Sequence, residues 1–249
     1  MSNYYEKLYD RGRKTRNIGC EIPMDVGWLL YKLDDEEYNY VWDCINKGKP
    51  EEDDIKYNLA GNVEQSYEIY DKDDWFFKNT LHPLMYEYNN QFDNLVKDLP
   101  LNSLAPKPRG NEKLPVFRAP MYMERFWVNF QKKHDFNPPH NHSGIYSFVI
   151  WMKIPISFKE QNEKRLASKH SNSPKASGFE FMYTDILGNP RTKLYELEPD
   201  MEGCMVFFPA KLHHQVFPFY DCDDYRVSVS GNISIDINRI KFERVDRSR

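Results

Sequence analysis

Apolar residues follow two different periods in the two halves of this chain. The first 120 residues contain a short apolar run at 27–33, which predicts a strand, and two segments of helical character. The cluster Asp34-Asp35-Glu36-Glu37 predicts a helix start, because acidic side chains favour the first turn, and we expect this helix to end near Lys47. A second helix is predicted over 73–99 from apolar residues three and four apart, with a kink or break at Pro83.

The remaining parts of this half show no clear period. We expect 1–24 to be an arm or a loose terminus, 51–72 to be irregular, and 100–120, which is rich in Pro, Lys, Asn and Gly, to be a connector.

From about residue 121 the pattern changes to short apolar runs bounded by Gly, Pro, Asn or Asp. Seven strands are predicted, at 124–131, 144–154, 178–184, 193–197, 204–208, 214–219 and 225–235. Such a series indicates a mainly β protein, a sandwich or a jelly roll. The polar insert at 159–175 is expected to be a mobile loop. We divide the chain into a support region at 1–115 that is not independent and a β core at 116–249.

Composition narrows the class of protein. The formal net charge is −4, so no broad cationic face for a nucleic acid is expected. The four cysteines form no Cys-x-x-Cys pair, which favours a reducing compartment over a disulfide framework or a zinc knuckle. We find no signal peptide and no run of about 18 apolar residues, so we expect a soluble cytoplasmic protein without membrane partners.

The segment Pro138-Pro139-His140-Asn141-His142-Ser143-Gly144 precedes a strongly apolar strand. In an extended backbone residues i and i+2 point to the same side, so His140 and His142 can present two imidazoles to one ion. The pair His213-His214 offers a third ligand. A lone His in a strand is more often packed or solvated than a ligand, so spacing alone leaves the metal site undecided.

A second signal lies in Arg226-Val227-Ser228, inside an alternating strand. The simpler interpretation is an amphipathic edge with its polar side in water. A guanidinium with a neighbouring hydroxyl also suits a ligand carboxylate, because the guanidinium fork donates two parallel hydrogen bonds.

Taken together, these motifs resemble the 2-oxoglutarate/Fe(II)-dependent oxygenase superfamily over 125–235. The likeness is nearest to its prolyl-hydroxylase-like and phage-encoded members. The matching pieces occur in the family's order: Trp127-x-Asn129, His140-x-His142-Ser-Gly, Glu202-Gly203, Phe208-Pro209 with His214-x-Val216, and Arg226-x-Ser228.

The resemblance implies a double-stranded β-helix, a jelly-roll or cupin-like core, with the N-terminal helices packed on its outside. It implies Fe(II) as the metal, 2-oxoglutarate as co-substrate and O2 as oxidant. Arg226 and Ser228 would bind the far carboxylate of 2-oxoglutarate, and Tyr146 and Asn129 are weaker candidates for hydrogen bonds to it. The expected reaction forms succinate and hydroxylates a C–H bond of a prime substrate, either a protein side chain such as proline or a small metabolite.

One departure concerns the metal ligands. The superfamily usually has His-x-Asp/Glu and a distal His, whereas His142 stands here at the carboxylate position. Three interpretations follow: a three-His iron site, a His142 outside the coordination sphere as in halogenating relatives, or lost catalysis. We favour the first, since both rings share a face. Spacing from Phe208-Pro209 favours His214 over His213 as the distal ligand, while Trp127 and Trp151 are expected to be packing residues.

Two other functions compete with the oxygenase. A jelly roll can be an inactive binding or structural module, and three histidines can hold Zn(II) or Mn(II) in a hydrolase or isomerase. Neither needs a buried carboxylate clamp, so a buried Arg226 would favour the oxygenase. The prime substrate and the oligomeric state are not encoded in any motif we find.

Overall fold

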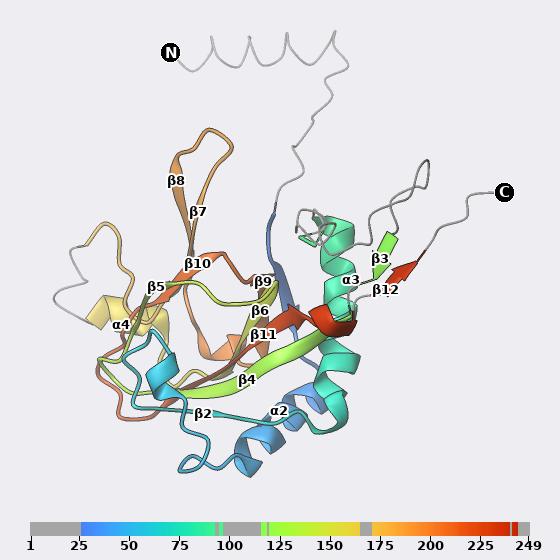
Figure 1. Cartoon of the computed structure of the whole chain (residues 1–249). Coiled ribbons are helices and arrows are strands. Elements are labelled where there is room, and N and C mark those ends of the chain that lie inside the picture. Colours follow the sequence, from blue (N-terminus) through green and yellow to red (C-terminus); the bar gives the residue numbers. More distant parts are fainter. Residues whose placement is uncertain are drawn as a thin grey trace, which may run out of the picture.

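Two antiparallel sheets form the body of the protein in its computed structural model (Figure 1). The structure describes residues 26–92, 95–96, 116–118, 120–164, 171–239 and 241–243. The predicted arm at 1–24, most of the connector at 100–120 and the middle of the 159–175 insert lie outside the described residues. A third, two-stranded sheet pairs β3 (Val116–Arg118) with β12 (Lys241–Glu243).

The major sheet has six strands in the order β1-β9-β6-β11-β4-β2. Its four central strands come from the second half of the chain: β4 (Met121–Gln131), β6 (Tyr146–Lys153), β9 (Cys204–Pro209) and β11 (Arg226–Ile235). Its two edges are β1 (Leu29–Lys32) and β2 (Gln65–Glu68). The first half of the chain therefore supplies both edge strands of a sheet whose central strands come from the second half.

The minor sheet has four strands in the order β5-β10-β7-β8. These are β5 (Asn137–His140), β10 (His213–Val216), β7 (Phe179–Thr184) and β8 (Pro190–Tyr195). The β7–β8 hairpin reaches away from the other described strands (Figure 1). Two facing antiparallel sheets agree with the expected mainly β, jelly-roll class.

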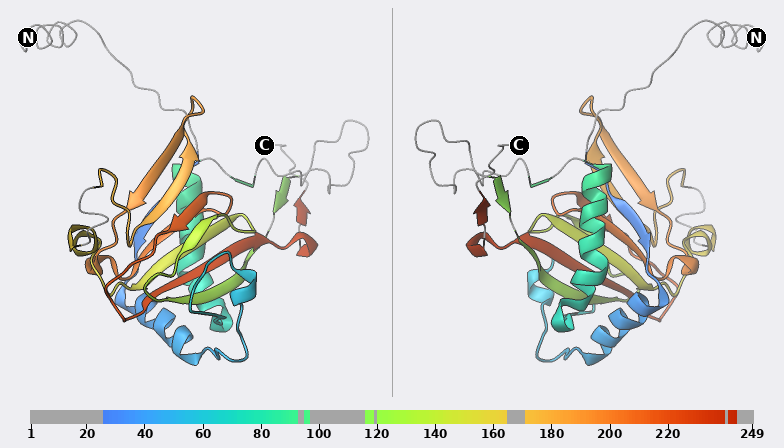
Figure 2. Two further views of the ribbon diagram at one scale, coloured as in Figure 1. Left: turned by 90° about the vertical axis from the view of Figure 1, so that its left-hand side faces the viewer. Right: turned by 90° about the vertical axis from the view of Figure 1, so that its right-hand side faces the viewer.

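Helices cover the outer face of the major sheet. Figure 2 shows α3 (His82–Gln91) lying across that face, with α2 (Asp35–Lys47) beside it. Apolar side chains of both helices share one buried cluster with alternate residues of the central strands, among them Val41, Tyr88, Phe126, Phe148 and Phe207. The inner face packs against the minor sheet through a second, smaller cluster around Trp151, Phe179 and Phe208. Burying both faces of the major sheet provides its main stabilisation.

Both ends of α2 agree with the sequence prediction. Asp34 accepts a hydrogen bond from the backbone of Glu37, and the Glu37 side chain accepts one from the backbone of Asp34, which forms a capping box. The helix ends at Lys47, as its pattern predicts.

The second predicted helix is shorter than expected. A 3-10 turn (Lys72–Asp74) and a π-helical turn (Phe77–Leu81) precede α3, and Pro83 lies in the first turn of α3, where its missing N–H costs little. The helix ends at Gln91, not near Leu99, because Phe92 is extended and packs on the Tyr88 ring.

Other differences arise at short elements. The predicted irregular stretch at 51–72 contains a 3-10 turn (Lys56–Asn58) and β2, and the start of the polar insert is a helix, α4 (Phe158–Lys164). Strand β5 escapes prediction because two of its four residues are prolines. Two further 3-10 turns span Pro199–Met201 and Ile237–Arg239. Among the described residues, no helix is long and apolar enough to cross a membrane.

Candidate functional site

Pairing between β5 and β10 brings two of the predicted histidines together. His140 ends β5 and lies opposite His214 of β10 in the antiparallel register. His142 follows in the turn that leads to β6, where its backbone N–H donates to Ala210 O at 2.8 Å. Gly144 completes the turn with φ +86°, a conformation that L side chains rarely adopt. The register and the turn together aim three rings at one point.

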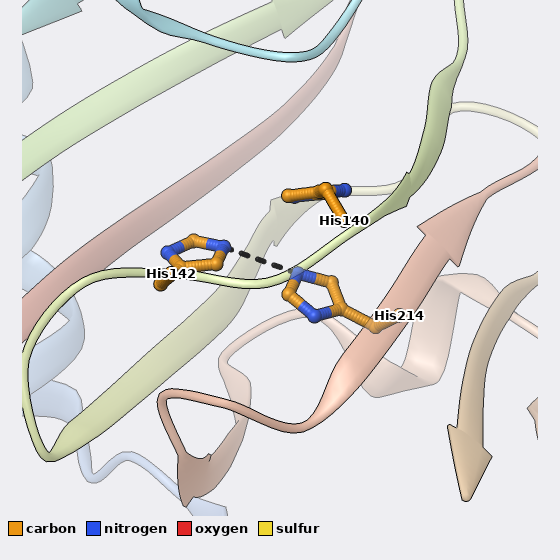
Figure 3. Close-up of side chains that lie close together, drawn as sticks. All are labelled: His140, His142 and His214. Carbon is orange, nitrogen blue, oxygen red and sulfur yellow. Dashed lines mark hydrogen bonds between the residues drawn. The ribbon is translucent and has the colours of Figure 1, made fainter.

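The three rings converge closely, as Figure 3 shows. One nitrogen from each of His140, His142 and His214 lies within 4.8 Å of the other two. The Nε2 atoms of His142 and His214 are 3.2 Å apart, and the ring centroids of His140 and His214 are 4.3 Å apart. His213, the neighbour of His214, is exposed and its Nε2 lies 3.2 Å from the Asn141 amide, outside the cluster.

Oxygen acceptors fix the tautomer of each ring. Nδ1 of His140 lies 2.7 Å from Pro138 O, and Nδ1 of His214 lies 3.2 Å from Leu212 O. Nδ1 of His142 lies 2.9 Å from Asn232 Oδ1. Because a carbonyl oxygen only accepts, each Nδ1 carries the hydrogen and leaves an Nε2 lone pair free. Such outer hydrogen bonds are typical of histidines that bind metals.

Burial keeps these rings neutral. Burial, reinforced by the charges of the other two rings, lowers the pKa of His214 well below its usual value. Burial also lowers the pKa of His140, and that of His142 to about 4. The apolar rings of Phe179 and Phe208 lie 5.4 and 5.1 Å from His214, centroid to centroid. A neutral imidazole with a free Nε2 is the form that binds a metal ion.

The donor set fits a divalent transition metal. Three imidazole nitrogens from two separate stretches meet with their lone pairs free, and imidazole suits Fe, Zn, Cu and Ni alike. Three protein ligands leave coordination positions for small molecules. The geometry therefore supports a site for a divalent transition metal.

A cavity of about 220 Å³ opens beside the cluster. Trp127, Asn129 and Ser228 line it, and the Trp127 ring stacks on His142 with centroids 5.5 Å apart. We expected Trp127 to be a packing residue, whereas it forms a wall of the cavity. Trp151 is a packing residue in the inner core, as expected.

Tyr146 does not line this cavity. It lies on the outer face of the major sheet, stacked on Phe207, and its hydroxyl donates to Asn89 Oδ1 at 3.1 Å. Strand alternation explains this position, since its neighbour Ser147 takes the inner face. The expected hydrogen bond from Tyr146 to a co-substrate does not fit this position.

Arg226 is fully buried beyond Ser228, two residues along β11. Its guanidinium donates to Gln131 Oε1 at 2.9 Å and to the carbonyl oxygens of Ser177 at 2.8 Å and Phe217 at 2.9 Å. The Phe219 ring lies beneath it, with its centroid 5.2 Å from Cζ. Burial lowers the pKa of Arg226 to about 9, so it remains a cation at neutral pH. All these partners are neutral, which leaves a buried positive charge without a counterion among the described residues.

Sequence reasoning missed Asn232 and Ser147. Asn232 accepts from His142 and from the Ser147 hydroxyl, which also donates to Gly231 O at 2.9 Å. The available signal was the alternation of β11, in which Asn232 shares the inner face with Ser228 and Ser230.

A comparison with protein families gives a match over part of the chain. Residues 125–232 match the model of the family described as "Putative 2OG-Fe(II) oxygenase". That segment holds the three histidines, Arg226 and Ser228. A search of the curated proteins found no match.

Among solved structures, an oxidoreductase of the 2OG-Fe(II) oxygenase family from Burkholderia pseudomallei is 15% identical, with 46% of this chain aligned to 43% of that chain and a TM-score of 0.31. A prolyl-4-hydroxylase from Pseudomonas putida is 14% identical over 83% of this chain and 91% of that chain, with a TM-score of 0.42. HygX from Streptomyces hygroscopicus, solved with nickel, 2-oxoglutarate and hygromycin B, is 9% identical over 92% and 86%, with a TM-score of 0.42.

Proposed function

We propose that this chain is a 2-oxoglutarate/Fe(II) oxygenase that holds Fe(II) through His140, His142 and His214, a proposal supported by the family match over residues 125–232. The family uses Fe(II), 2-oxoglutarate and O2. The reaction converts a C–H bond, O2 and 2-oxoglutarate into a C–OH group, succinate and CO2. The convergence of three imidazole nitrogens within 4.8 Å is the observation that carries the proposal.

The protein's part begins with the metal ligands. His140, His142 and His214 supply neutral nitrogen donors, and their Nδ1 hydrogen bonds hold each ring in place. Iron bound there would supply the redox chemistry that activates oxygen. The contacts of His142 with Asn232 favour a direct ligand role for His142 over a position outside the coordination sphere.

Arg226 and Ser228 are the proposed anchors of the far carboxylate of 2-oxoglutarate. Ser228 lines the cavity, and Arg226 is the next residue on the same face of β11. A buried guanidinium with only neutral partners is stabilised by an incoming carboxylate. Asn129, which lines the cavity and accepts from the Ser66 hydroxyl at 2.8 Å, is a further candidate contact.

The walls of the cavity complete the site. Trp127, Phe179 and Val149 are apolar and line it beside the three histidines. Such walls exclude water and keep the substrate near the metal. A buried Arg226 also favours the oxygenase over a three-His hydrolase or an inactive jelly roll, because neither needs a buried cation on this strand.

The proposed prime substrate is a protein side chain or a small metabolite. We also propose a cytoplasmic location, which is consistent with the free cysteines Cys44, Cys204 and Cys222.

Succinate formation from 2-oxoglutarate tests the proposed function. Wild-type protein with Fe(II) and O2 should form succinate, and His214→Ala should lower the rate at least about 100-fold by removing a buried ligand. His213→Ala is the matched control, because His213 is adjacent but exposed and outside the cluster. It should stay within about twofold of wild type. Equal losses in both variants, or no Fe(II)-dependent succinate in wild type, would contradict the proposal.

A further inference from the structure

The cavity beside the histidines has an unbalanced charge. Among the described residues that line it, none is Asp or Glu, and Arg125 is the only Lys or Arg. Apart from the three histidines, the other lining residues are apolar, amide or hydroxyl side chains. The cavity therefore presents a positive charge that its own walls do not neutralise.

A β-bulge places Arg125 at this cavity. Asn232 of β11 pairs with Arg125, whereas the next residue, Ile233, pairs with Met123, so Glu124 is an extra residue in β4. Bulges redirect side chains and occur next to active sites. Trp127 and Asn129 continue the same face of β4 into the cavity, while Phe126 and Val128 join the outer core. Arg125 thus lies on the inner face, beside the Asn232 that holds His142.

The Arg125 side chain is exposed and forms no ion pair or hydrogen bond with another described residue. The nearest acid along the strand, Glu124, instead accepts from the Ser143 hydroxyl at 3.4 Å. Lys211 adds a second cation near the rim, where its ammonium donates to His142 O at 3.1 Å. The entrance therefore combines two cations with one carboxylate that does not pair with Arg125.

The proposed cofactors do not remove this charge. The positive charge of Fe(II) and the negative charge of the 2-oxoglutarate dianion cancel formally, and imidazole ligands contribute no charge. The carboxylate that the family usually has among its metal ligands would have contributed one negative charge. We propose, on the basis of the proposed function, that the prime substrate is an organic anion whose carboxylate or phosphate group binds Arg125. The guanidinium fork matches either group, and the Asn141 and Ser143 side chains offer polar contacts at the same rim.

Probe binding to protein loaded with Mn(II) and saturated with 2-oxoglutarate tests this inference. Relaxation of the methyl protons of acetate and of the phosphorus of inorganic phosphate reports binding near the paramagnetic ion. Acetamide is the neutral probe of the same shape as acetate. Arg125→Gln should weaken the binding of at least one anion about tenfold, as expected for a lost charge-assisted contact, and should leave acetamide unchanged. Arg191→Gln is the control, because Arg191 is an exposed arginine that pairs with Asp185 on the hairpin outside the cavity.

The anion whose affinity falls more in Arg125→Gln indicates whether the substrate group at Arg125 is a carboxylate or a phosphate. Unchanged binding of both anions in Arg125→Gln, or equal binding of acetate and acetamide in wild type, would overturn the inference. Affinity for 2-oxoglutarate is measured first in the same samples. If Arg125→Gln loses its affinity for 2-oxoglutarate, Arg125 is the co-substrate anchor and the inference is overturned. If the wild-type protein does not bind 2-oxoglutarate, the proposed function itself is overturned.

Discussion

At the scale of single residues, the site depends on hydrogen bonds that orient ligands. The amide oxygen of Asn232 receives the His142 hydrogen, and its Nδ2 donates to Ser143 Oγ at 3.2 Å. Asn232 is itself buried on β11. Since the orientation of the His142 ring depends on this amide, Asn232 is a positioning residue rather than a ligand.

Replacing Asn232 tests that role. Asn232→Ala should weaken Mn(II) or Co(II) binding about 10- to 100-fold in calorimetry, because His142 loses its orienting acceptor. Asn232→Asp keeps an acceptor and should bind the metal at least as well as wild type. Ser234→Ala is the control, because Ser234 lies on the same strand but outside the lining of the cavity. Unchanged metal binding in Asn232→Ala would show that His142 does not ligate the metal.

At the scale of elements, the turn between β5 and β6 determines where His142 points. Gly144 has φ +86°, and a Cβ added there would lie 2.6 Å from Ile233 O, which is backbone and cannot move aside easily. The same turn carries Ser143 and receives the hydrogen bond from Asn232. A glycine is therefore required for both conformation and space.

Gly144→Ala should lower the free energy of unfolding by more than about 2 kcal/mol in urea denaturation, and should weaken metal binding as the turn shifts. Gly188 is a matched control at the tip of the β7–β8 hairpin, with φ +80° and no described atom within 4 Å of the place that a Cβ would take. Gly188→Ala should cost only about 1 kcal/mol of backbone strain. Equal costs for the two variants would refute the steric argument.

Most long elements were predictable from the sequence, because alternation along strands and the acidic start of α2 are strong local signals. Strands β2, β3, β5 and β12 were missed, since each has three or four residues and gains its stability from partners distant in sequence, such as β4 for β2 and β10 for β5. Convergence of His140 and His142 follows from their i, i+2 spacing. The positions of Asn232 and Trp127 beside the histidines do not follow from spacing along the sequence, because they depend on the register between β11, β4 and the turn that carries His142.

At the scale of the whole molecule, the first half of the chain supports the core. Strands β1 and β2 form the edges of the major sheet, and α2 and α3 cover its outer face. We propose on these grounds that residues 1–115 are a support region that does not fold independently of 116–249. The buried histidines also make the free energy of unfolding of the chain depend on pH.

Below pH 6.5 the unfolded chain takes up protons on histidines that stay neutral in the folded state. For His142 the pKa falls from 6.5 to about 4 on folding, so its contribution reduces stability as the pH drops through that window. The full loss for this group is about 3 kcal/mol. Denaturation of metal-free protein between about pH 7 and pH 4 should show this fall, and His142→Asn should show a shallower one. Identical pH profiles for the two proteins would contradict the burial argument.

The most direct test of the proposed iron site is anaerobic titration of the Fe(II)-loaded protein with 2-oxoglutarate, followed by visible absorption. A weak charge-transfer band should develop, because the keto acid would chelate an iron ion held by the three histidines. Arg226→Lys should require at least about tenfold more 2-oxoglutarate for the same band, since an ammonium cannot reproduce the guanidinium fork. No band in the wild type, or an undiminished band in His214→Ala, would contradict the proposed site.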